Sequence, residues 1–253
     1  MVEVPKEPAS DVPYRPSFPR VLKQSVVALY DHLGLVVTTN LLWITAGGLA
    51  LTAAYGTMRV VGPAGGLAAI PIALAGWAAA NAGMWYVAHR VATRQDVAPA
   101  DILIGVRTHF KASLGLVGIH TAGVILLASN VWFYGAKLAE EYDWSPAVAV
   151  FWLFVLAYFL TLMLYTYPFV MTQRVGAWAA SKKSALVAAD NPVFTLLLGL
   201  VAGAWGLLGA VPLWSRSMLP AGFAVLILAT CYASAVALLA SHALAALLKK
   251  YQD

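Results

Sequence analysis

The chain has 253 residues, of which 61% are apolar and only 11% are Asp, Glu, Lys or Arg, with a formal net charge of +5. Soluble globular proteins average about 45–50% apolar and about 25% charged residues, so a soluble domain of this length could not cover its surface with so few charges. The composition therefore excludes an ordinary soluble enzyme and a disordered regulator, and it predicts an all-α protein embedded in a membrane.

The chain begins with a proline-rich segment. Residues 1–19 contain five prolines, several charges and no apolar run, which predicts a disordered cytoplasmic tail rather than a cleavable signal peptide. In residues 20–33 the apolar side chains of Leu22, Val26, Leu29 and Leu33 recur at helical spacing. This pattern predicts an amphipathic helix that lies on the bilayer surface.

Residues 34–248 form the predicted transmembrane domain. Six intervals of 25 to 32 residues between His32 and Leu248 contain no Asp, Glu, Lys or Arg. A helix of about 20 apolar residues crosses the hydrocarbon core, so each interval is long enough for one span and too short for two. Backbone groups in lipid must find partners within their own segment, which requires helices. The predicted six-transmembrane-helix bundle has spans at about 34–57, 67–88, 112–134, 147–171, 193–213 and 220–246.

The basic residues predict the orientation of the bundle. Thirteen Lys and Arg side chains lie in the two terminal segments and the two connections that share one side, and three lie on the other side. By the positive-inside rule both termini are cytoplasmic. The excess positive charge therefore indicates anionic lipid headgroups and not nucleic acid. The predicted contacts to headgroups or to a cytoplasmic partner are Arg90, Arg94, Arg107, Lys111, Arg174, Lys182 and Lys183.

A weak internal similarity links the two long cytoplasmic connections. Residues 88–118 align without gaps at an offset of 84, with 7 identities in 31 positions. This alignment predicts a parallel repeat of a helical hairpin, a device used by many transport proteins. In a sequence so rich in Ala, Leu, Gly and Val several matches also arise by chance, so duplication and coincidence both stay open. The connections themselves are expected to be helical, lying on the membrane or docking a partner.

The predicted spans contain no Asp, Glu, Lys or Arg, which disfavours an ion-coupled transporter of the carboxylate type. The candidate intramembrane polar site consists of His120, Asn81, Asn130 and Asn40. Each of these side chains either bonds to a neighbouring helix or contacts a substrate. No histidine pair has metal-ligand spacing, and no serine lies in a nucleophile turn. We therefore expect no metal, no cofactor and no enzymatic activity.

Three short segments resemble the YesL-like family of bacterial integral membrane proteins, whose function is unknown. They are Asn40-Leu41-Leu42-Trp43, Arg107-Thr108-His109-Phe110-Lys111-Ala112 and Asn191-Pro192-Val193-Phe194. The chain departs from the family at residues 46–52, where a proline and a Thr-x-Gly-Pro-like turn are usual. Members are often encoded beside carbohydrate ABC importers, so the resemblance implies an accessory role in sugar uptake, with importer components as partners. It supplies no catalytic residues.

Three functions follow as hypotheses. The first is an accessory or regulator of carbohydrate uptake that acts through its basic cytoplasmic connections. The second is a small-molecule transporter in which His120, Asn81 and Asn130 line a polar path. The third, a membrane enzyme, is not supported by any constellation of residues.

Overall fold

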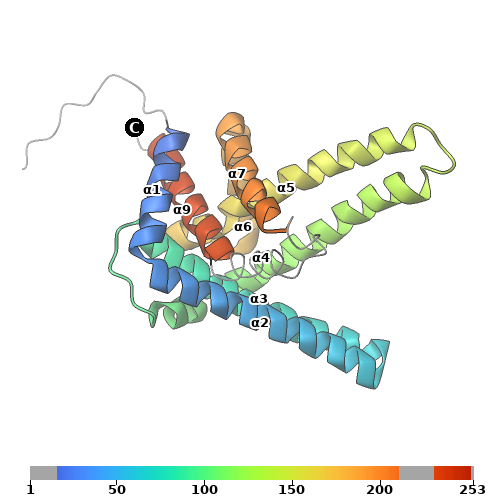
Figure 1. Ribbon diagram of the computed structural model, residues 1–253, viewed down its shortest axis with the longest axis horizontal. Helices are drawn as coiled ribbons and strands as arrows, with labels where there is room; N and C mark the ends of the chain where they lie inside the picture. Colours follow the sequence, from blue (N-terminus) through green and yellow to red (C-terminus); the bar gives the residue numbers. More distant parts are fainter. Residues whose placement is uncertain (1–15, 211–230, 252–253) are drawn as a thin grey trace, which may run out of the picture.

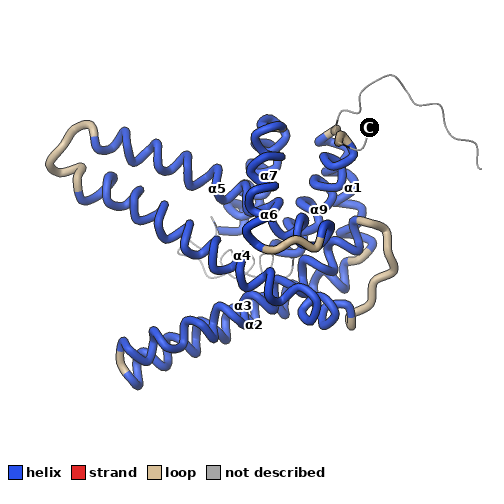
Figure 2. Tube along the Cα trace, turned by 180° about the vertical axis from the view of Figure 1, so that it is seen from behind, coloured by secondary structure: helices blue, strands red, loops and turns tan. Residues whose placement is uncertain are grey.

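The computed structural model describes residues 16–210 and 231–251 (Figure 1). The described residues form helices joined by loops, with no strand among them (Figure 2), which confirms the all-α part of the predicted fold class. Its helices are α1 (Phe18–Asp31), α2 (Leu33–Val61), α3 (Pro63–Ala92), α4 (Asp101–Trp132), the short π-helix η1 (Phe133–Lys137), α5 (Ser145–Gln173), α6 (Ala177–Asp190), α7 (Pro192–Ala210) and α9 (Ala233–Lys249).

Several helices are long and apolar enough to cross a membrane. The described residues contain four such segments: Leu33–Val61, Leu67–Ala92, Asp101–Lys137 and Ser145–Gln173. The pair α6 and α7 passes the same test together but is bent by 109°, and α9 is a shorter apolar helix. The structure therefore supports a multi-pass membrane protein with four to five candidate spans in its described part, where six were predicted for the whole chain. Most of the predicted tail and the first half of the predicted sixth span lie outside the described residues.

Two helical hairpins, α2–α3 and α4–α5, diverge from a common base (Figures 1 and 2). The core lies in that base, where the second half of α3 and the end of α5 contact α9, and the first half of α4 packs against α3 and α5. The far parts of both hairpins expose large apolar side chains such as Val60, Leu67 and Phe154. Soluble monomers rarely expose so many large apolar side chains on one part of the molecule, and their exposure here fits spans that face lipid.

Glycines allow α3 and α4 to approach closely at the base. A Cβ atom on Gly105 would lie 2.5 Å from the Cβ of Tyr86 and 2.9 Å from the carbonyl oxygen of Ala82. A Cβ on Gly83 would lie 2.7 Å from the side chain of Ile102. Small residues at such positions let helix backbones pack tightly in membranes, where van der Waals contact replaces the hydrophobic effect.

Polar side chains tie the helices of the base together. The Ser113 hydroxyl donates to the carbonyl oxygen of Ala78 (2.7 Å), so the Tyr167 hydroxyl, 3.3 Å away, donates to Ser113 Oγ. These two bonds link α3, α4 and α5. Tyr167 also stacks on Trp85, with ring centroids 5.2 Å apart and planes 5° from parallel. The base is thus fixed by a specific network as well as by apolar packing.

The segment predicted to be an amphipathic surface helix forms α1, which begins at Phe18 and ends at Asp31. It lies along α9 (Figure 1), and its Ser25 hydroxyl is 3.3 Å from His242 Nδ1. Because His242 Nδ1 lies 3.0 Å from the Leu238 carbonyl oxygen, that nitrogen carries the proton and donates to both oxygens. The pair is therefore a structural link between α1 and α9, because a protonated nitrogen cannot act as a base toward the serine.

The helix expected in the first cytoplasmic connection is not a separate element. It continues without a break into the third span as α4, which has 32 residues. At the offset of 84 residues, Thr108 within α4 corresponds to Pro192, where α6 ends and α7 begins. Proline lacks the backbone N–H that a continuous helix needs. The two segments therefore differ in shape at this point, and the duplication stays a prediction.

Candidate intramembrane binding site

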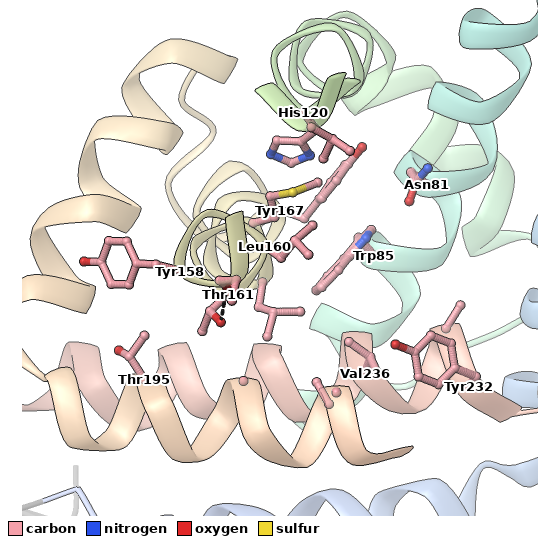
Figure 3. A pocket seen from close by; sticks show the side chains of 18 of the residues that line it. Asn81, Trp85, His120, Tyr158, Leu160, Thr161, Tyr167, Thr195, Tyr232 and Val236 are labelled. Atoms are coloured by element: carbon pink, nitrogen blue, oxygen red, sulfur yellow. Dashed lines mark hydrogen bonds between the residues drawn. The ribbon is translucent and has the colours of Figure 1, made fainter. Parts of the chain in front are cut away.

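A cavity of about 1180 Å³ lies where the two hairpins diverge, bounded by α2, α3, α4, α5, α7 and α9 (Figure 3). Most of its lining is apolar or aromatic, with a few uncharged polar groups, and none of the described residues that line it is Asp, Glu, Lys or Arg. Small-molecule sites typically have volumes of about 300–1,000 Å³ and this kind of lining. The cavity is therefore large enough for a ligand of substantial size.

His120 lies on α4 and lines this cavity, although only 8% of its surface is exposed. Its Nε2 atom is 3.3 Å from Thr166 Oγ1 on α5. The imidazole also meets the rings of Phe159 and Tyr167 edge to face, at centroid distances of 6.4 and 6.0 Å. The position of His120 is thus compatible with both predicted roles. The side chain bonds to a neighbouring helix, and it borders an open space in which it could contact a substrate.

Asn81 lies on α3, is buried, and lines the same cavity. Its Nδ2 donates to the carbonyl oxygen of Trp77 (2.8 Å), and its Oδ1 accepts from Trp43 Nε1 (3.2 Å). The two indoles contact each other at 4.4 Å, and Gly47 leaves room for the Trp77 ring, since a Cβ there would lie 2.0 Å from it. Asn81 therefore joins α2 to α3 and orients two tryptophans of the cavity wall.

The other two predicted amides lie elsewhere. Asn40 on α2 is fully buried, and its Oδ1 accepts from the backbone N–H of Ser234 in the first turn of α9 (3.1 Å). Beside it, Thr39 Oγ1 and Ser234 Oγ are 2.9 Å apart. Asn130 lies near the far end of α4, where its Nδ2 donates to the Leu126 carbonyl oxygen (2.8 Å). The structure thus brings His120 and Asn81 to one cavity and places Asn40 and Asn130 outside its lining.

Several lining residues escaped the sequence analysis. Their side chains are uncharged and aromatic or hydroxylic, and those labelled in Figure 3 are Trp85, Tyr158, Thr161, Tyr167, Thr195 and Tyr232. Tyr158 and Thr161 are three residues apart on α5, and this spacing places both on one face of a helix. Two polar side chains on one face of a span as apolar as α5 are the sequence pattern that could have identified these lining residues.

The predicted basic contacts fall into two groups. Arg90 forms an ion pair with Asp101 through Nη1, and its Nη2 donates to the Asp96 carbonyl oxygen (2.6 Å). Lys183 bonds to the side-chain oxygen of Gln173. These two cations are engaged within the chain, so Arg90 in particular holds the α3–α4 connection.

The remaining basic residues are exposed. Lys182 lies over the Trp178 ring at 5.4 Å. Arg94 and Arg174 have left-handed backbone conformations, with φ of 55° and 52°, directly after α3 and α5 end. The other two, Arg107 and Lys111, lie one turn apart on α4 and make no hydrogen bond or ion pair within the described part of the chain. They are accessible to a partner or to lipid headgroups.

No group of three or more His, Cys, Asp or Glu side chains in the described residues could hold a metal ion. The chain matches no protein-family model, no curated protein and no solved structure. The resemblance to the YesL-like family therefore stays a prediction that rests on the three short segments alone.

Proposed function

We propose that this chain is a multi-pass membrane protein that binds a small molecule in the cavity between its two hairpins, as the binding step of a transporter. The observation that carries this proposal is the cavity itself, about 1180 Å³ in volume and lined by six helices. Two of the polar residues expected on a transport path, His120 and Asn81, lie on its wall. Because none of the described residues of the lining is charged, we expect an uncharged solute that is not coupled to an ion through a carboxylate.

The proposed orientation places both chain ends in the cytoplasm of a bacterial cell, with the membrane an inner membrane. Two observations support it. The start of α1 and the end of α9 lie at the same end of the molecule (Figure 1), as an even number of crossings requires. The strong excess of Lys and Arg on one side of the predicted spans favours the cytoplasm for that end.

A substitution at Gly203 on α7 tests the binding function. Gly203 lines the cavity, and a Cβ atom there meets no other atom within 4 Å, so a side chain can start at this position and we expect the indole of a tryptophan to take up part of the cavity. We expect Gly203→Trp to lower photolabelling of the cavity wall by a neutral adamantyl diazirine about tenfold, equivalent to about 1.4 kcal/mol. Peptide mapping by mass spectrometry, on protein in lipid nanodiscs, measures the labelling.

The matched control is Gly118→Trp. Gly118 lies on α4, is exposed and has no atom within 4 Å of its Cβ position, but it is not part of the lining. Its substitution leaves labelling unchanged. Labelling that is spread evenly over all lipid-facing helices of the wild type, and that Gly203→Trp does not reduce, contradicts the proposal.

A second candidate is the accessory role in carbohydrate uptake, through contact with importer components. It is favoured by the exposed pair Arg107 and Lys111, which has no partner in the described part of the chain. Charge reversal of both to Glu is expected to abolish co-purification of any specific partner from native membranes. Arg59→Glu, at the far end of α2, is the control and retains the partner. The absence of every specific partner from wild-type preparations argues against this role.

A further inference from the structure

One ring nitrogen of His120 is available to a ligand. The Thr166 hydroxyl has a single hydrogen, which it donates to the Met163 carbonyl oxygen (2.8 Å). The contact of 3.3 Å between Thr166 Oγ1 and His120 Nε2 is therefore made by a proton on Nε2. In a neutral imidazole the other nitrogen, Nδ1, is then a hydrogen-bond acceptor.

This acceptor faces open space. Among the described residues, the only buried side-chain nitrogen or oxygen atoms that are sealed off and lack a partner are Arg90 Nε and Ser241 Oγ. His120 Nδ1 makes no hydrogen bond within the described part of the chain and is not sealed, and the residue lines the cavity. The cavity wall therefore presents an unpaired acceptor about halfway along the third predicted span.

Several other polar groups of the lining are engaged in hydrogen bonds within the protein. Thr161 donates to the Ala157 carbonyl oxygen (2.9 Å), and Thr195 Oγ1 lies 3.2 Å from the Tyr165 hydroxyl. Asn81 is bonded on both of its polar atoms, as described above. The wall as a whole is largely apolar and aromatic, with scattered uncharged polar groups, which suits a molecule with a small polar group on a large apolar body.

The exposed part of the cavity lining is apolar. Apolar residues of its rim are largely exposed, including Ile125 on α4, Phe154 on α5 (71%) and Leu196 on α7. Side chains of this kind face hydrocarbon in a membrane protein, so a ligand that passes them comes from the bilayer. A charged molecule would leave its hydration there without finding an opposite charge among the described residues of the lining, which is costly.

We propose that the cavity binds a neutral, lipid-soluble molecule that carries a hydroxyl group, and that this hydroxyl donates a hydrogen bond to His120 Nδ1. This assignment of the ligand class rests on the proposed binding function. The aromatic wall of the cavity, in which Trp85 stacks on Tyr167, contacts the apolar body of the ligand. The class comprises long-chain, isoprenoid and ring alcohols.

Three photoreactive probes with one carbon skeleton test the assignment. They are a diazirine-bearing dodecanol, its methyl ether and the corresponding carboxylate, added to protein in nanodiscs of zwitterionic lipid. We expect the alcohol to label the lining about fivefold more than the ether, because one neutral hydrogen bond contributes roughly 1 kcal/mol. The carboxylate labels least.

Two substitutions assign the preference to the imidazole. His120→Leu makes alcohol and ether label equally, while ether labelling stays at the wild-type level and shows that the cavity is intact. His120→Gln retains a carbonyl acceptor and restores part of the preference. Asn130→Leu, on the same helix but outside the lining, changes nothing.

The outcomes separate the two proposals. A preference for the carboxylate, equal labelling by alcohol and ether in the wild type, or a preference that survives His120→Leu overturns the ligand class and leaves the binding function standing. Failure of all three probes to label the lining overturns both.

Discussion

Replacing Gly105 by leucine is expected to destabilise the protein by about 3 kcal/mol, at the upper end of the range for overpacked cores. Gly105 lies at the base of the molecule, where α4 crosses α3. Its Cβ position is 2.9 Å from the Ala82 carbonyl oxygen and 2.5 Å from Tyr86 Cβ. Both atoms belong to or directly adjoin the α3 backbone, so no side-chain rotation relieves the clash and the two helices must separate.

Separation of these helices also weakens the bonds that cross the base. Ser113 lies two turns further along α4 and donates to the Ala78 carbonyl oxygen of α3 (2.7 Å). Unfolding in mixed micelles with increasing SDS measures the free energy. Gly105→Ala retains the clash of the Cβ atom and is expected to lie between the wild type and Gly105→Leu.

The matched control is Gly118→Leu on the same helix, where a Cβ atom meets nothing within 4 Å. It removes a glycine from a helix in the same way, and so it stabilises slightly or has no effect. Equal loss of stability at both positions would show that the close approach of α3 and α4 does not hold the base together.

The helices and their membrane character were predictable from the sequence, whereas their arrangement was not. A charge-free apolar interval requires a helix in lipid, whatever the helix contacts. Hydrocarbon is as apolar as leucine, so hydrophobicity does not distinguish a side chain that faces lipid from one that faces another helix. Leu114 is exposed and Leu116 is fully buried on the same turn of α4, and nothing in their residue type separates them.

The candidate site was likewise predictable from the sequence only in part. His120 and Asn81 stood out because polar side chains are rare in apolar spans, and both lie on the cavity. Asn130 gave the same signal, but its amide bonds to the carbonyl oxygen one turn before it on α4. Since a helix offers such a carbonyl to any asparagine, the residue type alone does not tell a local bond from a contact across helices.

The basic residues add a further limit to prediction. Counting charges placed Arg90 and Arg107 in the same cytoplasmic connection and gave them the same role. Only the fold reveals that Arg90 meets Asp101 across the turn between α3 and α4, while Arg107 is exposed. Arg90 and Arg107 are 17 residues apart in one basic segment. Whether each of them forms an ion pair or is exposed depends on where α4 begins.

The Arg90–Asp101 ion pair is expected to contribute about 2 kcal/mol, between the values for exposed and for fully buried pairs. Asp101 is buried, and the Arg90 side chain is 23% exposed. The carboxylate also accepts from the Ala98 backbone N–H (2.8 Å) and lies in the first turn of α4, where the helix dipole favours a negative charge. Asp101→Asn removes the charge but retains a side-chain oxygen for Ala98.

A double-mutant cycle separates the ion pair from the other contacts of these residues. Asp101→Asn and Arg90→Gln each lower the free energy of unfolding, and the double variant loses less than the two losses added together, by about 1 kcal/mol or more. Arg107→Gln is the control for loss of a basic side chain, and it leaves stability unchanged because Arg107 is exposed and makes no ion pair within the described residues. Strict additivity of Arg90→Gln and Asp101→Asn would mean that the two charges do not stabilise each other. Arg90 would then belong, with Arg107 and Lys111, among the cations available to lipid headgroups or a partner.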